Sequence, residues 1–278
     1  IRLPGVFTMR TPDDAIALRS YVQDRHCRSA VVVGAGFIGL EIAENLQAQG
    51  LAVTVIDAAD QILPKIFDPE MAGYARRRLR QNGIRVLTGT PLSEITGTER
   101  ADGVLANGTR IGADLVVLAI GIRPATTFLG GSGLAMEKGA IVVDEMMRTN
   151  IPDVYAAGDC ALVRNQQTRQ PQWSAMGSTA NITARALACT MTGTETAYGG
   201  CLGTGVVRLG AGRTGLTEAQ AREAGYEPVT VVCASDDKAH YYPGSSFFMT
   251  KLIADRSTHQ LLGIQVLGSG VDKMIDIA

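Results

Sequence analysis

The fold class of this chain follows from one stretch, Ala30-Val31-Val32-Val33-Gly34-Ala35-Gly36-Phe37-Ile38-Gly39-Leu40-Glu41. Apolar residues typical of a buried strand lead into a G-x-G-x-x-G turn, and a helical pattern follows, with Ile38, Ile42 and Leu46 on one face. This order of strand, glycine turn and helix predicts the first βαβ unit of a dinucleotide-binding domain.

Each glycine of the turn has its own expected role. Gly34 permits the turn, Gly36 lets a pyrophosphate approach the backbone, and Gly39 lets the helix and the strand pack closely. The helix that follows directs its free N–H groups toward the anion, and Ile38 lies in its first turn. Gly34, Gly36, Ile38 and Gly39 are therefore candidate cofactor-binding residues.

A second apolar strand, residues 52–56, ends at Asp57, which has the spacing of an acid that accepts from a ribose 2′-hydroxyl. No basic residue follows at Ala58 or Ala59, so a 2′-phosphate would meet a carboxylate without a nearby arginine. The sequence therefore predicts NAD(H) rather than NADP(H). A purely structural glycine turn would explain the motif, but not the strand, helix and acid around it.

Composition limits the classes of partner. The chain has 278 residues, 26 basic and 27 acidic side chains and a formal charge of -1, so neither nucleic acid nor an anionic membrane is an expected partner. No apolar run approaches the roughly 20 residues of a membrane span, and no secretory signal begins the chain, so we expect a cytoplasmic protein. The 5 cysteines form no CxxC and the 3 histidines do not cluster with them, so no metal site is expected.

The pattern along the chain indicates four segments. Residues 1–28 contain a short helix and are expected to form a connecting segment. Residues 29–144 alternate strands and helices as a NAD-binding domain does. The last strand of that domain leads to Gly121, at the sheet edge where doubly wound folds bind ligands.

Residues 145–195 carry a different signal. Gly158 permits close backbone approach and Asp159 could accept from a sugar or ribityl hydroxyl, although a simple Gly-Asp turn would look the same. Thr179 and Ala180 begin a helix whose N-terminus could stabilise negative charge on a ligand.

Residues 196–278 read as an α+β domain on an antiparallel sheet. Strands are expected over 206–209, 229–232, 247–252 and 262–266, with a short helix over 217–224. A second G-x-G-x-x-G, Gly210–Gly215, has only a short polar helix after it and no terminal acid, so we expect it to be a structural loop.

Four motifs together resemble a known family: residues 33–41, 119–124, 154–159 and 241–244. They are similar to the flavin-dependent pyridine nucleotide-disulfide oxidoreductases, within the group of coenzyme A-disulfide reductases, NADH oxidases and NADH peroxidases. The resemblance implies an α/β fold. It would consist of a Rossmann-like NAD-binding domain, remnants of an FAD-binding domain over 145–195, and an incomplete α+β interface (dimerisation) domain over 196–278.

The resemblance also implies roles for residues beside the nucleotide. Phe37 matches an aromatic gate over the nicotinamide pocket, against the alternative of an ordinary core phenylalanine. Glu41 matches an acid that orients the nicotinamide side, although an exposed helical glutamate would look the same.

For the flavin and the substrate, the resemblance implies a second set. Gly158 and Asp159 match the flavin ribityl contact, and Thr179 and Ala180 the helix start near the flavin pyrimidine ring. Tyr241 or Tyr242 matches a catalytic-site tyrosine that reaches the thiol site of the partner subunit, against the alternative of strand-edge aromatics.

The implied enzyme is a homodimer that passes hydride from NADH to FAD and then, through a cysteine, to a small-molecule disulfide, persulfide or peroxide. The family begins with a separate FAD-binding unit and its redox cysteine, and nothing in this sequence matches them. We therefore expect an N-terminally truncated chain that binds NAD(H) and is inactive alone. The alternatives are a non-catalytic dinucleotide-binding or dimerisation module, and a rubredoxin or ferredoxin reductase-like enzyme, against which residues 241–244 argue.

Overall fold

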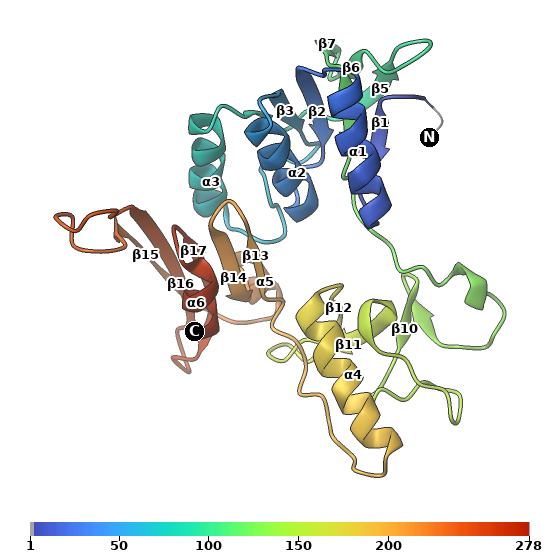
Figure 1. Cartoon of the computed structure of the whole chain (residues 1–278). Coiled ribbons are helices and arrows are strands. Elements are labelled where there is room, and N and C mark those ends of the chain that lie inside the picture. Colours follow the sequence, from blue (N-terminus) through green and yellow to red (C-terminus); the bar gives the residue numbers. More distant parts are fainter. Residues whose placement is uncertain (1–2, 278) are drawn as a thin grey trace.

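The computed structural model describes residues 3–277, which form three units that follow one another along the chain (Figure 1). The first unit holds a parallel sheet, the second a small mixed sheet with one long helix, and the third an antiparallel sheet. The mixed α/β architecture expected from the sequence is confirmed.

The sheet of the first unit is entirely parallel, and its strands lie in the order β1-β8-β2-β3-β4. Its strands are β1 (Val6–Thr8), β2 (Ser29–Val33), β3 (Ala52–Ile56), β4 (Arg85–Leu87) and β8 (Leu115–Leu118).

Each face of this sheet has its own apolar core. Val32 and Val55 point to the face that packs against three helices, while Val31 and Ile56 point to the other face. The helices are α1 (Pro12–Asp24), α2 (Phe37–Ala48) and α3 (Pro69–Gln81); the other face is covered by an antiparallel sheet of β5 (Leu92–Thr96), β6 (Gly103–Ala106) and β7 (Thr109–Gly112). Successive side chains of these strands point to opposite faces of the sheet. Because both faces are buried, the central strands are apolar along their length.

The residues before Ser29 do more than connect. Val6 of β1 pairs with Val116 of β8, so this segment supplies an edge strand to the parallel sheet. Leu18 of α1 is buried in the same core as Val32 and Val55.

The second unit contains β9 (Met136–Glu137), β10 (Ala140–Val142), β11 (Ala161–Arg164) and β12 (Pro171–Trp173), preceded by the short helix η1 (Thr127–Leu129). A second short helix, η2 (Gly158–Cys160), faces the long helix α4 (Gly177–Met191). The start of α4 matches the expected helix, but its N-cap is Met176 and no side chain caps it.

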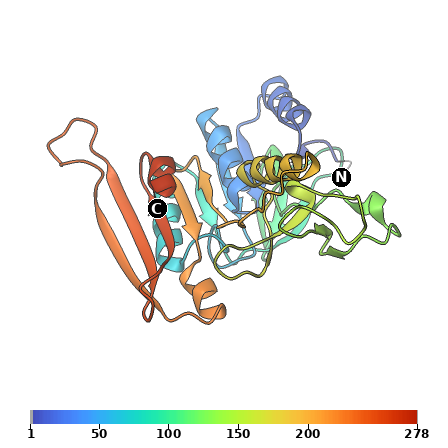
Figure 2. The same cartoon turned by 90° about the horizontal axis from the view of Figure 1, so that it is seen from below.

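The third unit is an antiparallel sheet in the order β13-β14-β17-β16-β15 (Figure 2). Its elements are β13 (Gly205–Val207), β14 (Ala211–Gly215), α5 (Glu218–Glu223), β15 (Pro228–Asp236), β16 (Phe247–Asp255), β17 (Leu261–Leu267) and α6 (Val271–Ile277). Thr217 and Gln220 form the capping box expected for the short helix. The predicted strands in this region are confirmed, except that β13 ends at Val207, so residues 208–209 lie in the turn before β14.

The expectation of a loop over Gly210–Gly215 was wrong, because residues 211–215 are the buried strand β14. Its glycines allow close approach of neighbouring backbone: a Cβ on Gly215 would lie 2.2 Å from the Leu262 carbonyl oxygen. Glycine is rare in strand interiors, which is why the pattern did not indicate a strand.

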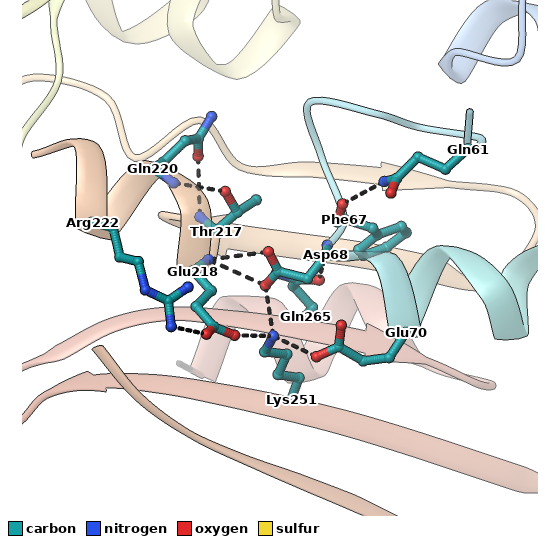
Figure 3. Close-up of polar contacts among 10 residues, drawn as sticks. All are labelled: Gln61, Phe67, Asp68, Glu70, Thr217, Glu218, Gln220, Arg222, Lys251 and Gln265. Atoms are coloured by element: carbon teal, nitrogen blue, oxygen red, sulfur yellow. Dashed lines mark hydrogen bonds and ion pairs between the residues drawn. The ribbon is translucent and has the colours of Figure 1, made fainter. Parts of the chain in front are cut away.

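A buried cation joins the first unit to the third (Figure 3). Lys251 of β16 is fully buried, and its Nζ lies 3.0 Å from Asp68 Oδ2 and 2.8 Å from Glu218 Oε2. Glu70 is its third carboxylate partner. Asp68 and Glu70 lie at the start of α3, whereas Glu218 begins α5, so one ammonium group holds elements that are distant in the sequence.

Hydrogen bonds between Asp68 and the neutral side chain of Gln265 complete this cluster. The Asp68 N–H donates to Gln265 Oε1 at 2.9 Å, and Gln265 Nε2 donates to Asp68 Oδ2 at 2.6 Å. Burial lowers the pKa of Lys251, but its hydrogen bonds to the carboxylates outweigh burial and hold that pKa above its ordinary value. The hydrogen bond from Lys251 lowers the pKa of Glu218.

Replacing Lys251 with methionine should lower the free energy of unfolding by about 3–5 kcal/mol at neutral pH, because the buried carboxylate of Asp68 loses its cation. Urea unfolding measures the effect. Lys138→Met, whose side chain is 91% exposed, should change stability by less than about 0.5 kcal/mol.

The pH dependence gives an independent check. The pKa of Glu218 is lowered in the folded chain, so its contribution to stability is present above its ordinary value of 4.5 and is lost as the pH falls through the lowered value. The stability gap between the wild type and Lys251→Met should therefore narrow below about pH 4.5. A stability difference between the wild type and Lys251→Met that stays constant from neutral pH down to about pH 3 would contradict this account.

Candidate nucleotide-binding site

The turn between β2 and α2 is fixed by backbone contacts with neighbouring strands. The Gly34 N–H donates to the Ile56 carbonyl at 2.8 Å, and the Ala119 N–H donates to the Val33 carbonyl at 2.8 Å. Gly34 has φ +106°, and a Cβ there would lie 2.3 Å from the Ala119 carbonyl oxygen. Only glycine fits this position without moving the backbone.

The other two glycines of the turn have opposite surroundings. A Cβ on Gly39 would lie 1.9 Å from the Gly34 carbonyl oxygen, so the helix and the turn approach too closely for a side chain. A Cβ on Gly36 would meet nothing within 4 Å. The backbone at Gly36 therefore faces open space, where the pyrophosphate is predicted to lie.

The N-terminus of α2 points its donors into this space. Gly36 is the N-cap and has no side-chain cap, and the first helical hydrogen bond runs from the Leu40 N–H to the Gly36 carbonyl at 3.0 Å. Within residues 3–277, the N–H groups of Phe37, Ile38 and Gly39 have no hydrogen-bond acceptor. These donors and the helix dipole favour an anion.

Asp57, at the end of β3, is anchored to the glycine turn. Its Oδ2 accepts from the Ala35 N–H at 2.6 Å and its Oδ1 accepts from the Ala59 N–H at 2.8 Å. A carboxylate has further lone pairs, so these bonds leave it able to accept from a hydroxyl. Sequence reasoning placed Asp57 at this edge but missed that it also organises the turn.

Gly121 lies at the same edge, just after β8. It has φ +113°, and a Cβ there would meet nothing within 4 Å. Since β3 and β8 lie on opposite sides of β2, the structure brings Gly34, Asp57 and Gly121 to neighbouring strand ends. The chain leaves β2 toward β3 and returns at β8, so this is the switch point where such sheets bind ligands.

Three further predicted residues face away from that edge. Phe37 packs against β13, where a Cβ on Gly205 would lie 2.7 Å from the Phe37 Cζ atom. Ile38 and Glu41 line a groove of about 780 Å³ between α1 and α2, and Glu41 Oε1 accepts from the Arg208 N–H at 3.3 Å. Their roles toward a nicotinamide stay predictions.

The predicted flavin residues Gly158, Thr179 and Ala180 lie together at the start of α4. The Gly158 N–H donates to Thr183 Oγ1 at 3.1 Å, and a Cβ on Gly158 would lie 3.6 Å from the Ala180 Cβ. The buried Thr179 hydroxyl is hydrogen-bonded to the Ser174 hydroxyl at 2.9 Å.

Asp159 differs from its neighbours. It is exposed, and its carbonyl accepts from Trp173 Nε1 at 2.7 Å, while no hydrogen bond fixes its carboxylate within residues 3–277. The carboxylate is thus free to accept from a hydroxylated ligand.

Tyr241 and Tyr242 lie in the loop between β15 and β16, with exposed fractions of 77% and 60%. Figure 2 shows this loop extending away from the rest of the chain. The structure does not bring the two tyrosines to the glycine turn or to η2.

Residues 3–277 contain neither a membrane-spanning helix nor a cluster of metal-binding side chains. In this range no helix is long and apolar enough to cross a membrane. No group of three or more His, Cys, Asp and Glu residues in the same range could hold a metal ion.

Sequence reasoning missed the Lys251 cluster. The alternation of β16 places Lys251 on the same buried face as Met249 and Ile253, and a charged residue at such a position signals a buried partner. The identity of that partner could not follow from the sequence, because Glu70 lies 181 positions away.

Alanine at the three glycines of the turn should separate packing from ligand contact. Gly39→Ala and Gly34→Ala should each destabilise the chain by roughly 1–3 kcal/mol or more, since a Cβ collides with backbone. Gly36→Ala should leave the free energy of unfolding within about 0.5 kcal/mol of the wild type. Urea unfolding of the three variants tests this, and equal losses at all three positions would refute the assignment.

The chain is similar to known proteins along its whole length. The family profile of the pyridine nucleotide-disulphide oxidoreductases matches residues 1–186, and the profile of their dimerisation domain matches residues 203–278. The NAD(P)H sulfur oxidoreductase (CoA-dependent) of Pyrococcus furiosus is 36% identical over 282 residues, covering 100% of this chain and 64% of the relative. An NADH oxidase of Methanocaldococcus jannaschii is 34% identical, covering 96% of this chain and 60% of the relative.

Solved structures give the same family of folds. An NAD-dependent persulfide reductase from A. fulgidus superimposes with a TM-score of 0.94 and 34% identity, covering 100% of this chain and 52% of that one. A water-forming NADH oxidase from Lactobacillus brevis, bound to NADH, gives a TM-score of 0.89 and 26% identity, covering 100% and 63%. The chain thus spans less than two thirds of the length of these proteins.

Proposed function

Because the chain belongs to the pyridine nucleotide-disulphide oxidoreductase family, we propose that its residues 29–144 bind NADH at the turn over Gly36. Members of this family bind FAD and NAD(P)H. The observation that carries the proposal is the open space over Gly36, into which the unpaired N–H groups of α2 point beside the Asp57 carboxylate.

Different residues at this edge of the sheet are proposed to bind different parts of the nucleotide. The N–H groups of Phe37 and Ile38 stabilise the pyrophosphate charge, and Gly36 lets it come close to the backbone. Asp57 accepts from the ribose 2′-hydroxyl and repels a 2′-phosphate, so NADH is preferred to NADPH. Gly121 leaves the opposite side of the site open.

In the whole protein, residues 145–195 would contribute to the FAD site. The juxtaposition of Gly158 with Thr179 and Ala180, and the free carboxylate of Asp159, support this part of the proposal. The uncapped N-terminus of α4 can stabilise negative charge on the flavin ring system. Bound FAD would supply the two-electron carrier between NADH and the final acceptor.

The proposed acceptor is a small disulfide, persulfide or peroxide, as the names of the relatives suggest. Residues 196–278 would form the homodimer interface, since β15 is exposed along its length at the edge of the sheet. Tyr241 and Tyr242 would reach the thiol site of the partner subunit. A cytoplasmic location agrees with the free thiols of Cys27, Cys160, Cys189, Cys201 and Cys233.

Asp57→Ala should raise the dissociation constant for NADH by roughly tenfold or more. It removes the acceptor for the ribose and also releases the Ala35 N–H that holds the turn. Calorimetric titration with NADH measures the change. Asp24→Ala, an equal loss of charge at an exposed position on α1, should leave the affinity unchanged.

The visible spectrum tests how far the function extends in this chain. The purified 278 residues should bind one NADH and show no flavin band, because the chain has one complete glycine fingerprint and only part of a flavin site. Stoichiometric FAD that is bleached by NADH would overturn this expectation. If the chain does not bind NADH, the proposed function is wrong.

A further inference from the structure

A second cavity, of about 650 Å³, lies between the β11–β12 hairpin and α5, among residues that the proposed function does not use. The hairpin belongs to the second unit, and α5 belongs to the third. The polar residues that line it are Asn165, Thr168, Gln170, Gln172, Arg213, Gln220 and Glu223.

Arg213 places a positive charge in the wall of this cavity. It is 93% buried, with an exposed fraction of only 7%. Its Nε donates to the Gly203 carbonyl at 3.3 Å, and its Nη1 donates to the Lys65 carbonyl at 3.2 Å and to Gln220 Oε1 at 3.1 Å. All these acceptors are neutral.

No carboxylate within residues 3–277 forms an ion pair with Arg213, and its Nη2 has no acceptor there. A buried cation without an ion-pair partner is costly: burial lowers the pKa of Arg213, and the charge of Asp68 offsets this only in part. An anion in the cavity would relieve that cost.

Gln172 adds a second free donor, and its orientation follows from its neighbours. Asn165 Oδ1 accepts from the N–H groups of Gln167 at 2.8 Å and Thr168 at 2.9 Å. The Asn165 amide nitrogen must therefore face Gln172, and it donates to Gln172 Oε1 at 2.7 Å. This leaves Gln172 Nε2 without an acceptor in the described range of the chain.

Gln220 repeats this arrangement on the other wall. Its Oε1 accepts both from the Thr217 N–H and from Arg213 Nη1, each at 3.1 Å. Figure 3 shows the amide nitrogen of Gln220 directed away from Thr217. Its Nε2 is thus a third donor without an acceptor among residues 3–277.

Two of these donors, Arg213 Nη2 and Gln172 Nε2, lie near each other beside Gly203. A Cβ on Gly203, which has φ +67°, would lie 2.9 Å from Arg213 Nη2 and 3.0 Å from Gln172 Nε2. The two nitrogens are therefore within about 6 Å of each other in the wall of the cavity, so one oxyanion could accept from both. We propose that this cavity binds a small oxyanion, through a carboxylate or phosphate group held by Arg213, Gln172 and Gln220.

The volume of the cavity and the charge at its rim limit the class of ligand that can bind. The cavity has the volume of a small-molecule site, so it has room for an organic acid or a phosphate ester beyond the anionic group itself. Glu223 puts an exposed carboxylate at the rim, which disfavours a ligand with a second negative charge on that side. A bound ligand touches both the hairpin and α5 and thus stabilises the arrangement of the second and third units.

The test is calorimetric titration of the whole chain, saturated with NADH, with inorganic phosphate and with acetate as separate probes. Gln172→Glu keeps the oxygen that accepts from Asn165 but replaces the free donor with a carboxylate oxygen. It should raise the dissociation constant of the bound probe at least tenfold and leave NADH affinity unchanged, which also shows that the variant is folded.

Gln220→Glu should act in the same direction, since its oxygen still caps α5. Gln49→Glu carries the same charge change at the exposed C-cap of α2, outside this cavity, and should bind the probe like the wild type. The probe that binds more tightly to the wild type distinguishes a phosphate from a carboxylate ligand. The proposal is overturned if neither probe binds, or if both bind Gln172→Glu as tightly as the wild type.

Discussion

Backbone atoms approach one another so closely at Gly34, Gly39 and Ala119 that no side chain fits between them. This contact fixes three elements at once, because it ends β2, begins α2 and holds the last strand of the sheet beside them. The same geometry leaves Gly36 uncovered. One steric constraint therefore builds the sheet and exposes the anion-binding end of the helix.

The carboxylate of Asp57 links this constraint to ligand choice. It holds the Ala35 N–H on one side and the Ala59 N–H on the other, so its position is set before any nucleotide arrives. Binding then requires little reorganisation of the turn. Lys251 similarly fixes the position of the first unit relative to the third, because its ion pairs hold the start of α3 against the sheet of the third unit.

Much of the fold could be predicted because it depends on local patterns. The apolar run into Gly34, the acid at Asp57 and the capping box at Thr217 all have short-range signals, and the structure contains the corresponding elements. β14 was missed because its glycines serve close backbone packing, which resembles a loop in sequence. Edge strand β1 was missed because its partner Val116 lies far along the chain.

The candidate site was harder to predict than the fold. Sequence spacing could place Gly36 and Asp57 at one edge, but it could not show that Phe37 packs against Gly205 or that Asp57 binds the turn itself. The donors of the second cavity depend on side-chain orientations set by Asn165, which no sequence pattern encodes. Pairings between distant residues are the common reason for these gaps.

The central claim is that a dinucleotide lies over Gly36 against the first N–H groups of α2. The most direct measurement is a two-dimensional ¹⁵N–¹H NMR titration of the chain with NADH. The account predicts that the largest amide shift changes occur at Phe37, Ile38 and Gly39. Changes centred instead on Gly158 and Ala180, with those three amides unmoved, would contradict it.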